Sequence, residues 1–328
     1  MATGRDDTMA RGSDQRDRSQ AIRPAASSGA TPGVSAPGRG AAAGRSAVAG
    51  PPAGALPSAP GGARPAPRTT VPARRLAGGE SVDSVECLIE EVPVALVYNG
   101  ISHAVMLATP SDLEDFGLGF SLSEGILASP DELYDCEVVT CPDGTEVRLE
   151  IASARLAALK VRRRSLAGRT GCDLCGVESL QAAVRDPAPV APRPPLAAAA
   201  IHRALAELTT WQPLHRATGA AHAAAWADNA GRLIAVREDV GRHNALDKLV
   251  GTLARRRFDP STGFVVVTSR ASYEMVQKTA AAGIGLLAAV SAPTAYAVRL
   301  AEAAHLTLIG LARAGRLTAY SHPEQLCE

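Results

Sequence analysis

The sequence lacks long apolar runs and is poor in cysteine. No stretch of roughly eighteen or more apolar residues occurs, so we expect no membrane-spanning helix. The N-terminus also lacks the compact apolar segment of a secretory signal. Six cysteines in 328 residues are too few for a disulfide-stabilised secreted scaffold. We therefore expect a protein of the cytoplasm, where thiols stay reduced.

Aromatic residues are absent from the first 79 residues, which instead contain thirteen glycines and ten prolines. This composition cannot bury enough apolar surface to offset the entropy lost on ordering, so residues 1–80 are predicted to be a disordered tail. The first 79 residues hold eleven arginines against four aspartates, whereas residues 80–328 hold 23 basic and 29 acidic side chains. Because the remaining part is acidic, the composition does not indicate a nucleic-acid-binding protein.

Residues 81–183 are predicted to form a smaller N-terminal region of hairpins and helices that ends in a cysteine-containing loop. Asn99-Gly100, a strong hairpin pattern, lies between expected strands at Val94–Tyr98 and Ile101–Met106. Ser111 and Glu114 have the spacing of a capping box that begins a helix, and Gly125 is expected to end it. A second hairpin and a basic helix follow, at Glu137–Cys141 with Glu146–Ile151 and at Ala154–Ala167.

A proline-rich linker, residues 184–196, leads into a second region, residues 197–328, in which apolar strands alternate with helices. The expected strands are Leu233–Val236, Phe264–Thr268, Gly285–Val290 and Leu306–Leu311, and the expected helices are Asn244–Ala254, Ser272–Ala282 and Thr294–His305. This alternation predicts an α/β core with a mostly parallel sheet covered by helices. In such a sheet, ligands bind beyond the carboxyl ends of the strands.

Small polar residues and arginines follow these strand ends. Each helix is expected to begin at a small polar residue that caps it, namely Asn244, Ser272 and Thr294. Arg242 and Arg270 stand beside two of these helix starts. Helix N-termini and arginine side chains that converge on one sheet edge form an anion site, typically for phosphate.

Cys172 and Cys175 form a CxxC pair in a glycine-flanked loop, and three chemistries use this spacing. A structural zinc site needs four ligands, and Cys136 and Cys141 cannot readily complete it, because five residues apart on a strand they point to opposite faces. A thioredoxin-type redox pair would follow a strand directly, whereas this pair follows a basic helix. The third chemistry uses a thiolate to accept and hand on a group, and nearby arginines would favour that thiolate while Asp173 opposes it. The spacing alone leaves all three open.

The order of motifs along residues 88–325 resembles one family closely, the formate dehydrogenase accessory sulfurtransferases (FdhD). The motifs that carry the resemblance are Glu90-Glu91-Val92-Pro93, Tyr98-Asn99-Gly100, Thr109-Pro110, Asp112-Leu113, Gly119-Phe120, Ser123-Glu124-Gly125, Arg169-Thr170-Gly171-Cys172, Cys175-Gly176, Glu238-Asp239-Val240-Gly241-Arg242-His243, Ser269-Arg270-Ala271-Ser272-Tyr273-Glu274, Lys278, Ser291-Ala292-Pro293-Thr294 and Leu306-Thr307-Leu308. So many separated motifs in the right order make the resemblance specific.

The resemblance implies a sulfur carrier that formate dehydrogenase requires for its activity. A cysteine desulfurase would load a persulfide sulfur onto Cys172, with Cys175 assisting. The carrier would then transfer the sulfur to the molybdenum cofactor, bis-molybdopterin guanine dinucleotide, before the cofactor enters formate dehydrogenase. The family's cofactor-binding segment falls on Leu311, Ala312, Arg313, Ala314, Gly315 and Arg316, and the candidates at the expected anion edge are Arg242, His243, Ser269 and Arg270. The resemblance also implies a homodimer and a three-layer core like that of the cytidine deaminases.

The sequence departs from two known patterns, the spacer between the family's cysteines and the metal-binding motifs of the zinc deaminases. The family commonly has Gly-Val between its cysteines, whereas this chain has Asp173-Leu174, which stiffens the loop and adds a negative charge. A zinc deaminase needs His-x-Glu and Pro-Cys-x-x-Cys, but His222 is followed by two alanines and Cys172 follows a glycine, so we expect no deamination. The competing interpretations are a chaperone that binds the cofactor without using the thiols, and a zinc-stapled structural module.

Overall fold

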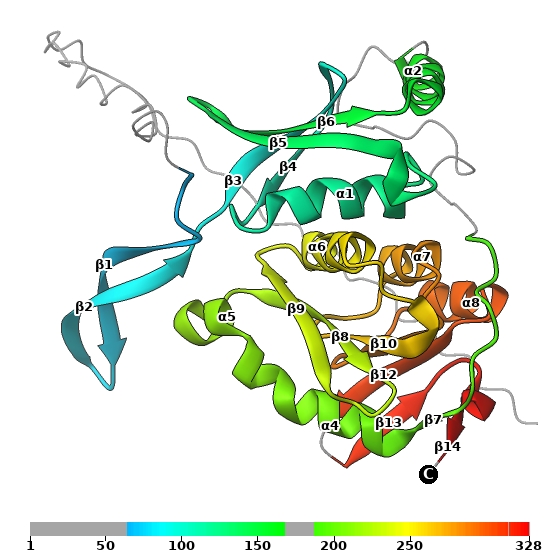
Figure 1. Ribbon diagram of the computed structural model, residues 1–328. Coiled ribbons are helices and arrows are strands. Elements are labelled where there is room, and N and C mark those ends of the chain that lie inside the picture. Colours follow the sequence, from blue (N-terminus) through cyan, green and yellow to red (C-terminus); the bar gives the residue numbers. More distant parts are fainter. Residues whose placement is uncertain (1–63, 168–186, 314, 328) are drawn as a thin grey trace, which may run out of the picture. The chain divides into compact units, whose positions relative to one another are not determined.

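The computed structural model describes residues 64–167, 187–313 and 315–327, with the backbone alone for residues 162–167 (Figure 1). These residues form a mixed α/β fold. The helices are α1 (Leu113–Ser123), α2 (Ser153–Ala167), α4 (Ala198–Leu208), α5 (Pro213–Thr218), α6 (Arg242–Arg255), α7 (Tyr273–Ala281) and α8 (Ala295–Ala303). Short 3₁₀ turns lie at η1 (Pro130–Glu132), η2 (Thr209–Trp211), η3 (Pro260–Thr262) and η4 (Pro323–Gln325). Cys172 and Cys175, the predicted thiol pair, lie outside the described residues.

The N-terminal region contains a four-stranded sheet in the order β4-β3-β6-β5. Its strands are β3 (Val92–Tyr98), β4 (Ile101–Ala108), β5 (Leu133–Cys141) and β6 (Gly144–Ile151). Both predicted hairpins are confirmed, and Asn99 and Gly100 take the positive φ angles of +45° and +78° that a tight primed turn requires. Helix α1 packs on this sheet through a core that includes Phe116 and Leu118.

The second region contains a six-stranded sheet in the order β13-β12-β11-β10-β8-β9. Its strands are β8 (His222–Asp228), β9 (Leu233–Asp239), β10 (Gly263–Val267), β11 (Leu286–Ala289), β12 (Thr307–Arg313) and β13 (Arg316–Ala319). The four predicted strands are confirmed as β9 to β12, and all four run in one direction. The prediction of a mostly parallel sheet is wrong, because β8 and β13 run the opposite way and three of the five neighbouring pairs are antiparallel.

Helices cover both faces of this sheet, as Figure 1 shows. One core cluster joins α6, α7 and α8 to side chains such as Trp226, Val265 and Leu287. The other joins α4 to side chains of opposite parity on the same strands, such as Phe264 and Leu286. Two short strands, β7 (Leu196–Ala197) and β14 (Leu326–Cys327), pair in parallel beside this layer. The arrangement confirms three layers, and it follows from strands that are apolar on both faces.

The two regions meet where α1 packs on α6, with unusually close backbone contact. A Cβ atom on Gly119 would lie 1.7 Å from the carbonyl oxygen of Asp247, and one on Gly251 would lie 1.9 Å from that of Asp115. No side chain larger than hydrogen fits at either position, so these two glycines permit the close helix crossing.

The predicted start of α1 is wrong in detail. Asp112, not Ser111, is the N-cap residue, and its side chain makes no capping hydrogen bond. Asp112 has the left-handed φ of +51°, which sets the direction of the chain as it enters the helix. Gly125 follows the helix with φ +63°, so its predicted role at the helix end is confirmed.

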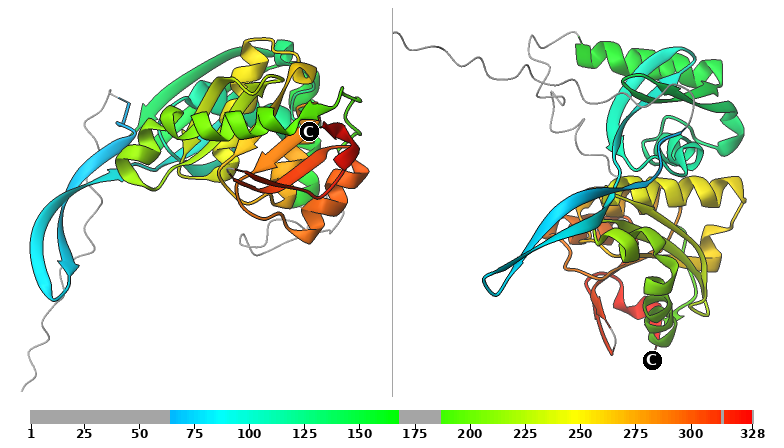
Figure 2. Two further views of the ribbon diagram at one scale, coloured as in Figure 1. Left: turned by 90° about the horizontal axis from the view of Figure 1, so that it is seen from below. Right: turned by 90° about the vertical axis from the view of Figure 1, so that its left-hand side faces the viewer.

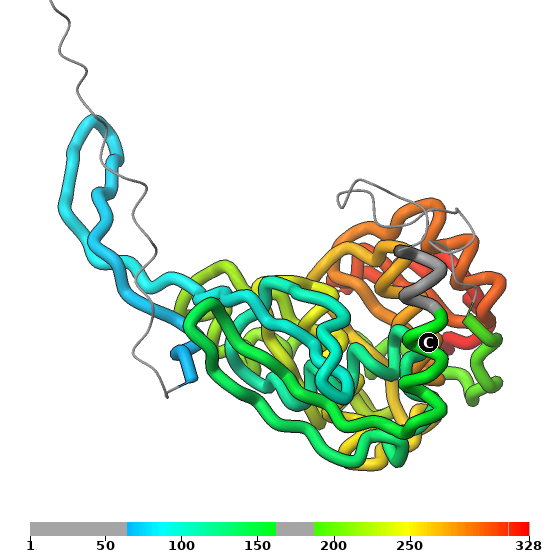
Figure 3. Tube along the Cα trace, turned by 90° about the horizontal axis from the view of Figure 1, so that it is seen from above, coloured from blue at the N-terminus to red at the C-terminus, as the bar shows by residue number. Residues whose placement is uncertain are grey.

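A long antiparallel ribbon precedes the N-terminal sheet and extends away from the rest of the described residues (Figures 2 and 3). It consists of β1 (Arg68–Ala77) and β2 (Glu80–Ile89), joined by a turn at Gly78-Gly79. The predicted tail boundary near residue 80 is therefore wrong, because β1 lies within it. The prediction failed because the pairing with β2 supplies β1 with hydrogen bonds that its own composition does not reveal.

No helix in the described residues is long and apolar enough to cross a membrane.

The glycine contact between α1 and α6 leads to a stability prediction. We expect Gly251→Ala to lower the free energy of unfolding by about 1–3 kcal/mol or more, because the new methyl group overlaps the Asp115 carbonyl oxygen. Urea denaturation measures this change. Gly285→Ala is the matched control, because a Cβ there meets its nearest heavy atom at an ordinary 3.4 Å. Equal stability of the two variants would contradict the prediction.

Candidate functional site

The carboxyl ends of β9, β10, β11 and β12 meet at one edge of the six-stranded sheet, as the sequence predicts. A cavity of about 430 Å³ opens at this edge, between the strand ends and the segment from α4 to α5. Thr268, Val290 and Ala312 line it from the ends of three strands, and His202 and His215 line it from the helical side. Nδ1 of His202 is buried and has no hydrogen-bond partner among the described residues. This edge therefore offers both space and unused polar groups to a ligand.

The segment implied for cofactor binding lies at the end of β12 and the turn into β13. Leu311 has φ +52°, an uncommon value for a non-glycine residue, where the pairing of β12 with β13 shifts register. Ala312 is buried, whereas Arg313 and Arg316 are exposed, and Gly315 turns the chain with φ +72°. Ala314 lies outside the described residues. Of this segment, Ala312 and Arg313 line the cavity.

Arg242 and His243 begin helix α6 at the same edge. Nε of Arg242 is buried, and the part of the chain that the structure describes offers it no hydrogen-bond partner. His243 is held by neighbours, because its Nε2 lies 2.7 Å from a carboxylate oxygen of Glu274 and 3.5 Å from the hydroxyl of Ser272. The histidine hydrogen bond lowers the pKa of Glu274, which favours the ionised carboxylate. Arg242 therefore retains an unused donor, while His243 is engaged.

Ser269 and Arg270 follow β10. The Ser269 hydroxyl donates to the carbonyl oxygen of Arg270 at 3.0 Å and is buried, so its first role is to hold the turn. Arg270 is exposed to solvent. Of the three expected helix caps only Thr294 is confirmed, since its hydroxyl accepts the backbone N–H of Ala297 at 3.2 Å. Ser272 makes no capping bond, and Asn244 lies inside the first turn of α6 rather than before it.

Three histidines that the sequence analysis did not assign to this edge also lie there, namely His202, His215 and His222. His222 begins β8, which runs antiparallel to its neighbours and so starts at the carboxyl edge. Burial lowers its pKa, and the charges of Arg242, His215 and His243 lower it further, so the neutral imidazole is favoured. These groups therefore lie close enough to act on one another electrostatically. The sequence contains no sign of this position of His222, because β8 is mostly alanine and its pairing with β9 and β10 could not be predicted from that pattern.

Two carboxylates of the Glu238-Asp239 motif are used internally. Glu238 accepts the backbone N–H groups of Leu214 and His215 at 2.9 and 2.8 Å, at the start of α5. Asp239 pairs with Lys248 at 2.6 Å, and both side chains are fully buried. Lys248 also donates to the carbonyl oxygen of Thr109, whose N–H donates back to Asp239. Burial lowers the pKa of Lys248, and the adjacent carboxylate opposes that effect. Both carboxylates are therefore held by internal contacts, and Asp239 has a buried counter-charge.

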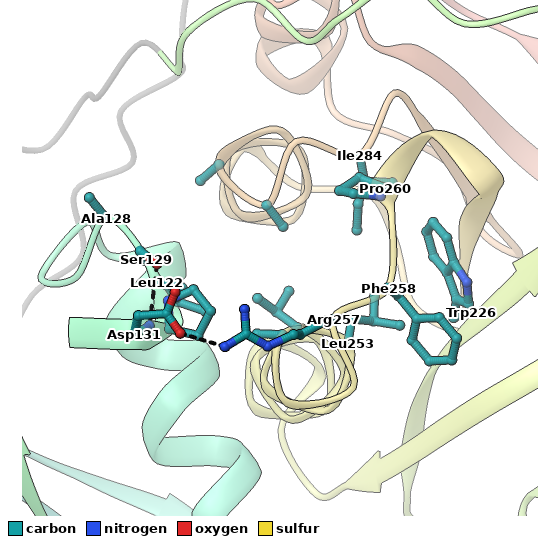
Figure 4. A pocket seen from close by; sticks show the side chains of 15 residues that line it. Leu122, Ala128, Ser129, Asp131, Trp226, Leu253, Arg257, Phe258, Pro260 and Ile284 are labelled. Atoms are coloured by element: carbon teal, nitrogen blue, oxygen red, sulfur yellow. Dashed lines mark hydrogen bonds and ion pairs between the residues drawn. The ribbon is translucent and has the colours of Figure 1, made fainter. Parts of the chain in front are cut away.

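A different cavity, of about 360 Å³, lies at the opposite, amino edge of the sheet (Figure 4). Its walls include Trp226, Leu253 and Phe258, and its rim carries an ion pair between Arg257 and Asp131 at 2.6 Å. No predicted site residue lines it. Within residues 64–167, 187–313 and 315–327, no cluster of three or more His, Cys, Asp or Glu side chains is arranged to hold a metal ion.

The buried ion pair gives a second prediction. Lys248→Met should lower the free energy of unfolding by about 3–5 kcal/mol, because it leaves the buried Asp239 carboxylate without its counter-charge. The measurement is urea denaturation at neutral pH. Arg232→Met, which breaks the exposed pair with Asp228 at 2.7 Å, is the control and should change stability little. A change of less than about 1 kcal/mol for Lys248→Met would contradict the prediction that the buried pair is needed for stability.

Comparison with known proteins places the chain in a family. The family model described as the FdhD/NarQ family matches residues 89–327. A protein of Cupriavidus necator named sulfur carrier protein FdhD is 58% identical over 270 residues, covering 82% of this chain and 94% of that protein. A protein of the same name from Variovorax paradoxus is 54% identical over 263 residues, covering 80% of this chain and 95% of that protein. The crystal structure of a candidate formate dehydrogenase accessory protein from Desulfotalea psychrophila matches with a TM-score of 0.62 and 25% identity, covering 79% of this chain and 99% of that one. The match over nearly all of the described residues shows that this chain belongs to the FdhD/NarQ family.

Proposed function

We propose that this protein is a sulfur carrier that serves formate dehydrogenase. The observation that carries the proposal is the 58% identity to a named sulfur carrier across 94% of that relative's length. The carboxyl edge of the sheet supports it, because Arg242 and Arg313 there suit an anionic cargo, and the carboxylates of Asp239 and Glu274 are held by Lys248 and His243. In this proposal a cysteine desulfurase is the donor and formate dehydrogenase is the final recipient.

The chemical step proposed for Cys172 is the transfer of a sulfane sulfur. The Cys172 thiolate attacks the outer sulfur of a persulfide on the desulfurase, and a new S–S bond forms at Cys172. The S–S bond of the donor breaks, and the donor cysteine leaves as a thiolate. The sulfur is moved without net oxidation or reduction, so no further reagent is needed. Cys175 is proposed to assist, and Asp173 between them should disfavour the Cys172 thiolate through its negative charge.

The cargo proposed for the carboxyl edge is the molybdenum cofactor, bis-molybdopterin guanine dinucleotide. Its phosphates need cationic and N–H donors, and the edge supplies the buried unpaired Nε of Arg242 and the exposed Arg313. The cavity of about 430 Å³ is in the range of ligand sites and would hold a nucleotide-sized part of the cofactor. His202, with its unpaired Nδ1, is suited to hydrogen-bond such a group. Arg270, His243, Ser269 and the segment 311–316 are proposed to border it. The cytidine-deaminase-like origin of this core stays a prediction.

Mass spectrometry after incubation with a cysteine desulfurase and cysteine tests the sulfur-transfer step. We expect the peptide that contains Cys172 to gain one sulfur atom, and the Cys172→Ala variant to gain none there. Cys136 is an internal control, because burial raises its pKa to about 11 and leaves almost no thiolate at neutral pH. No gain at Cys172, or an equal gain at Cys136, would refute the step. A Cys172→Ala, Cys175→Ala variant that still supports formate dehydrogenase would instead favour a chaperone.

We also propose that the homodimer implied by the resemblance forms through the β1–β2 ribbon. Four large apolar side chains on the ribbon are exposed, Leu76 by 75%, Val82 by 59%, Val85 by 71% and Leu88 by 45%. A two-stranded ribbon is marginally stable alone, so it needs a partner that is always present, as a second copy is. Four of its six charged side chains pair within the ribbon, Arg74 with Asp83 and Arg75 with Glu86, and the other two, Arg68 and Glu80, are of opposite sign. Two identical ribbons would therefore meet without charge repulsion.

Sedimentation velocity tests the ribbon contact. We expect the full chain to sediment as a dimer and a Leu76→Asp, Val85→Asp variant to sediment as a monomer, because two buried carboxylates would disfavour the interface. Tyr134→Asp alters an equally exposed side chain, at 70%, outside the ribbon and should leave the dimer intact. A monomeric wild-type chain, or a dimer that survives both ribbon substitutions, would overturn this proposal. Sulfur loading measured on the same samples shows independently whether the carrier step is intact.

A further inference from the structure

A small cavity of about 110 Å³ lies at the amino edge of the six-stranded sheet, opposite the proposed carrier site. The segment before β7, the starts of β11 and β12, and the C-terminal turn η4 enclose it. The residues that line it are Val190, Ala191, Pro192, Arg193, Gly285, His305, Thr307, His322, Glu324 and Gln325. None of these residues belongs to the carboxyl edge described above.

Three buried polar atoms on residues that line this cavity have no hydrogen-bond partner within residues 64–167, 187–313 and 315–327. They are Nε of Arg193, Oγ1 of Thr307 and Oε1 of Gln325. Thr307 is fully buried, so its hydroxyl has no access to bulk solvent. Buried polar groups are almost always hydrogen-bonded in native proteins, and an isolated exception is uncommon. Three exceptions around one cavity point to a hydrogen-bonding occupant rather than to three separate defects.

The charge on Arg193 narrows the chemistry of that occupant. Its two terminal nitrogens donate to the carbonyl oxygen of Gly263 at 3.1 Å and to Oδ1 of Asn229 at 2.7 Å, which are both uncharged acceptors. Among the described residues, no carboxylate lies within ion-pair distance of this guanidinium, and burial lowers its pKa. A partly desolvated cation with a spare N–H donor calls for a negatively charged acceptor.

The acidic side chains near the cavity are engaged with His322. Its Nδ1 lies 3.2 Å from Oε1 of Glu324, and its Nε2 lies 3.5 Å from Oε2 of Glu302. The His322 ring also stacks on His305, with ring centroids 5.6 Å apart. His322 thus contacts both glutamates, of which Glu324 also lines the cavity, whereas no carboxylate among the described residues lies within ion-pair distance of Arg193.

We propose that this cavity binds a small oxyanion of the phosphate or sulfate class. One anion oxygen would accept from Nε of Arg193 and another from the Thr307 hydroxyl, and the Gln325 amide, turned about its last bond, would donate to a third. A volume of about 110 Å³ holds roughly three to four waters, which is comparable to the space of one tetrahedral oxyanion. Ordered water alone is the competing occupant, and it would leave the guanidinium without a counter-charge.

Anion binding here would fasten the segment before β7 to the sheet. Arg193 belongs to a stretch, residues 187–195, that contains no helix or strand. The anion would join it to Thr307 at the start of β12 and to Gln325 near the C-terminus. The inference does not depend on the sulfur-carrier proposal, because none of its residues is used there.

Thermal unfolding of the full chain in inorganic phosphate tests the site, with sodium chloride at matched ionic strength as the reference. Phosphate at about ten times its Kd should raise Tm by about 3–6 °C. Arg193→Met and Thr307→Val should each lose most of this shift, relative to their own Tm in chloride. Arg232→Met removes an exposed arginine and should keep the full shift. Phenyl phosphate, run in parallel, shows whether the site accepts a phosphate that is part of a larger molecule.

Selenate soaked into crystals gives a second, positional measurement. We expect anomalous density within hydrogen-bond distance of Nε of Arg193 and Oγ1 of Thr307. Water density alone in the cavity would overturn the proposal. A phosphate shift that Arg193→Met leaves unchanged would also overturn it, and would place the anion at another site such as the carboxyl edge. Loss of the shift in both variants, with sulfur loading of Cys172 unaffected, would establish the site independently of the carrier function.

Discussion

The buried ion pair between Asp239 and Lys248 is the constraint on which the rest of the candidate site depends. Taking both charges out of water is costly, and only close contact with further hydrogen bonds offsets that cost. Thr109 supplies these bonds from the N-terminal region, through its backbone N–H to Asp239 and its carbonyl oxygen to Lys248. The pair therefore joins the two regions at one point. It also fixes the loop before α6, because Asp239 accepts the N–H of Gly241 at 2.7 Å. The position of Arg242 follows from that loop.

The residue immediately before Lys248 takes part in a second buried cluster. Asp247 lies beside Lys248 on α6, yet it contacts Lys278 of α7 at 3.0 Å and the Ser123 hydroxyl of α1 at 2.6 Å. Burial raises the pKa of Asp247, and the ammonium of Lys278 opposes that effect. The adjacent residues Asp247 and Lys248 of α6 thus contact different partners. Asp247 contacts α1 and α7, whereas Lys248 contacts Asp239 and Thr109. Rotation or sliding of α6 would break both clusters at once, which makes this helix a fixed support for the carboxyl edge.

Much of the fold follows from local patterns in the sequence, and the failures have local causes. The Asn99-Gly100 turn and the alternation of apolar strands with helices predict most elements, because turn geometry and side-chain periodicity are properties of short segments. Strand β8 was missed because His222–Asp228 is mostly alanine, which has little strand preference. Strand β1 was missed because its arginines and proline are typical of a disordered tail, and its pairing with β2 cannot be predicted from composition. The prediction that Ser111 caps α1 failed because Asp112, with its left-handed φ, occupies the N-cap position.

The sequence predicts which loops share the carboxyl edge but not which of its charged side chains are already engaged, and the difference has a physical basis. Strand direction determines which loops share an edge, so strand order alone places Arg242, after β9, and Ala312, in β12, at the same edge of the sheet. Whether a charged side chain is free for a ligand depends on its partners, and these come from distant segments. Glu238 is taken up by the start of α5, and Asp239 by a lysine nine positions later and a threonine 130 positions earlier. Of the two acids only Asp239 gains a counter-charge, from Lys248, whereas Glu238 is held by backbone N–H groups. Alongside the hydrogen bond from His243, the nearby charge of Arg242 helps to lower the pKa of the Glu274 carboxylate. The charge at this edge is therefore set by contacts between distant segments, and local sequence patterns do not reveal such contacts.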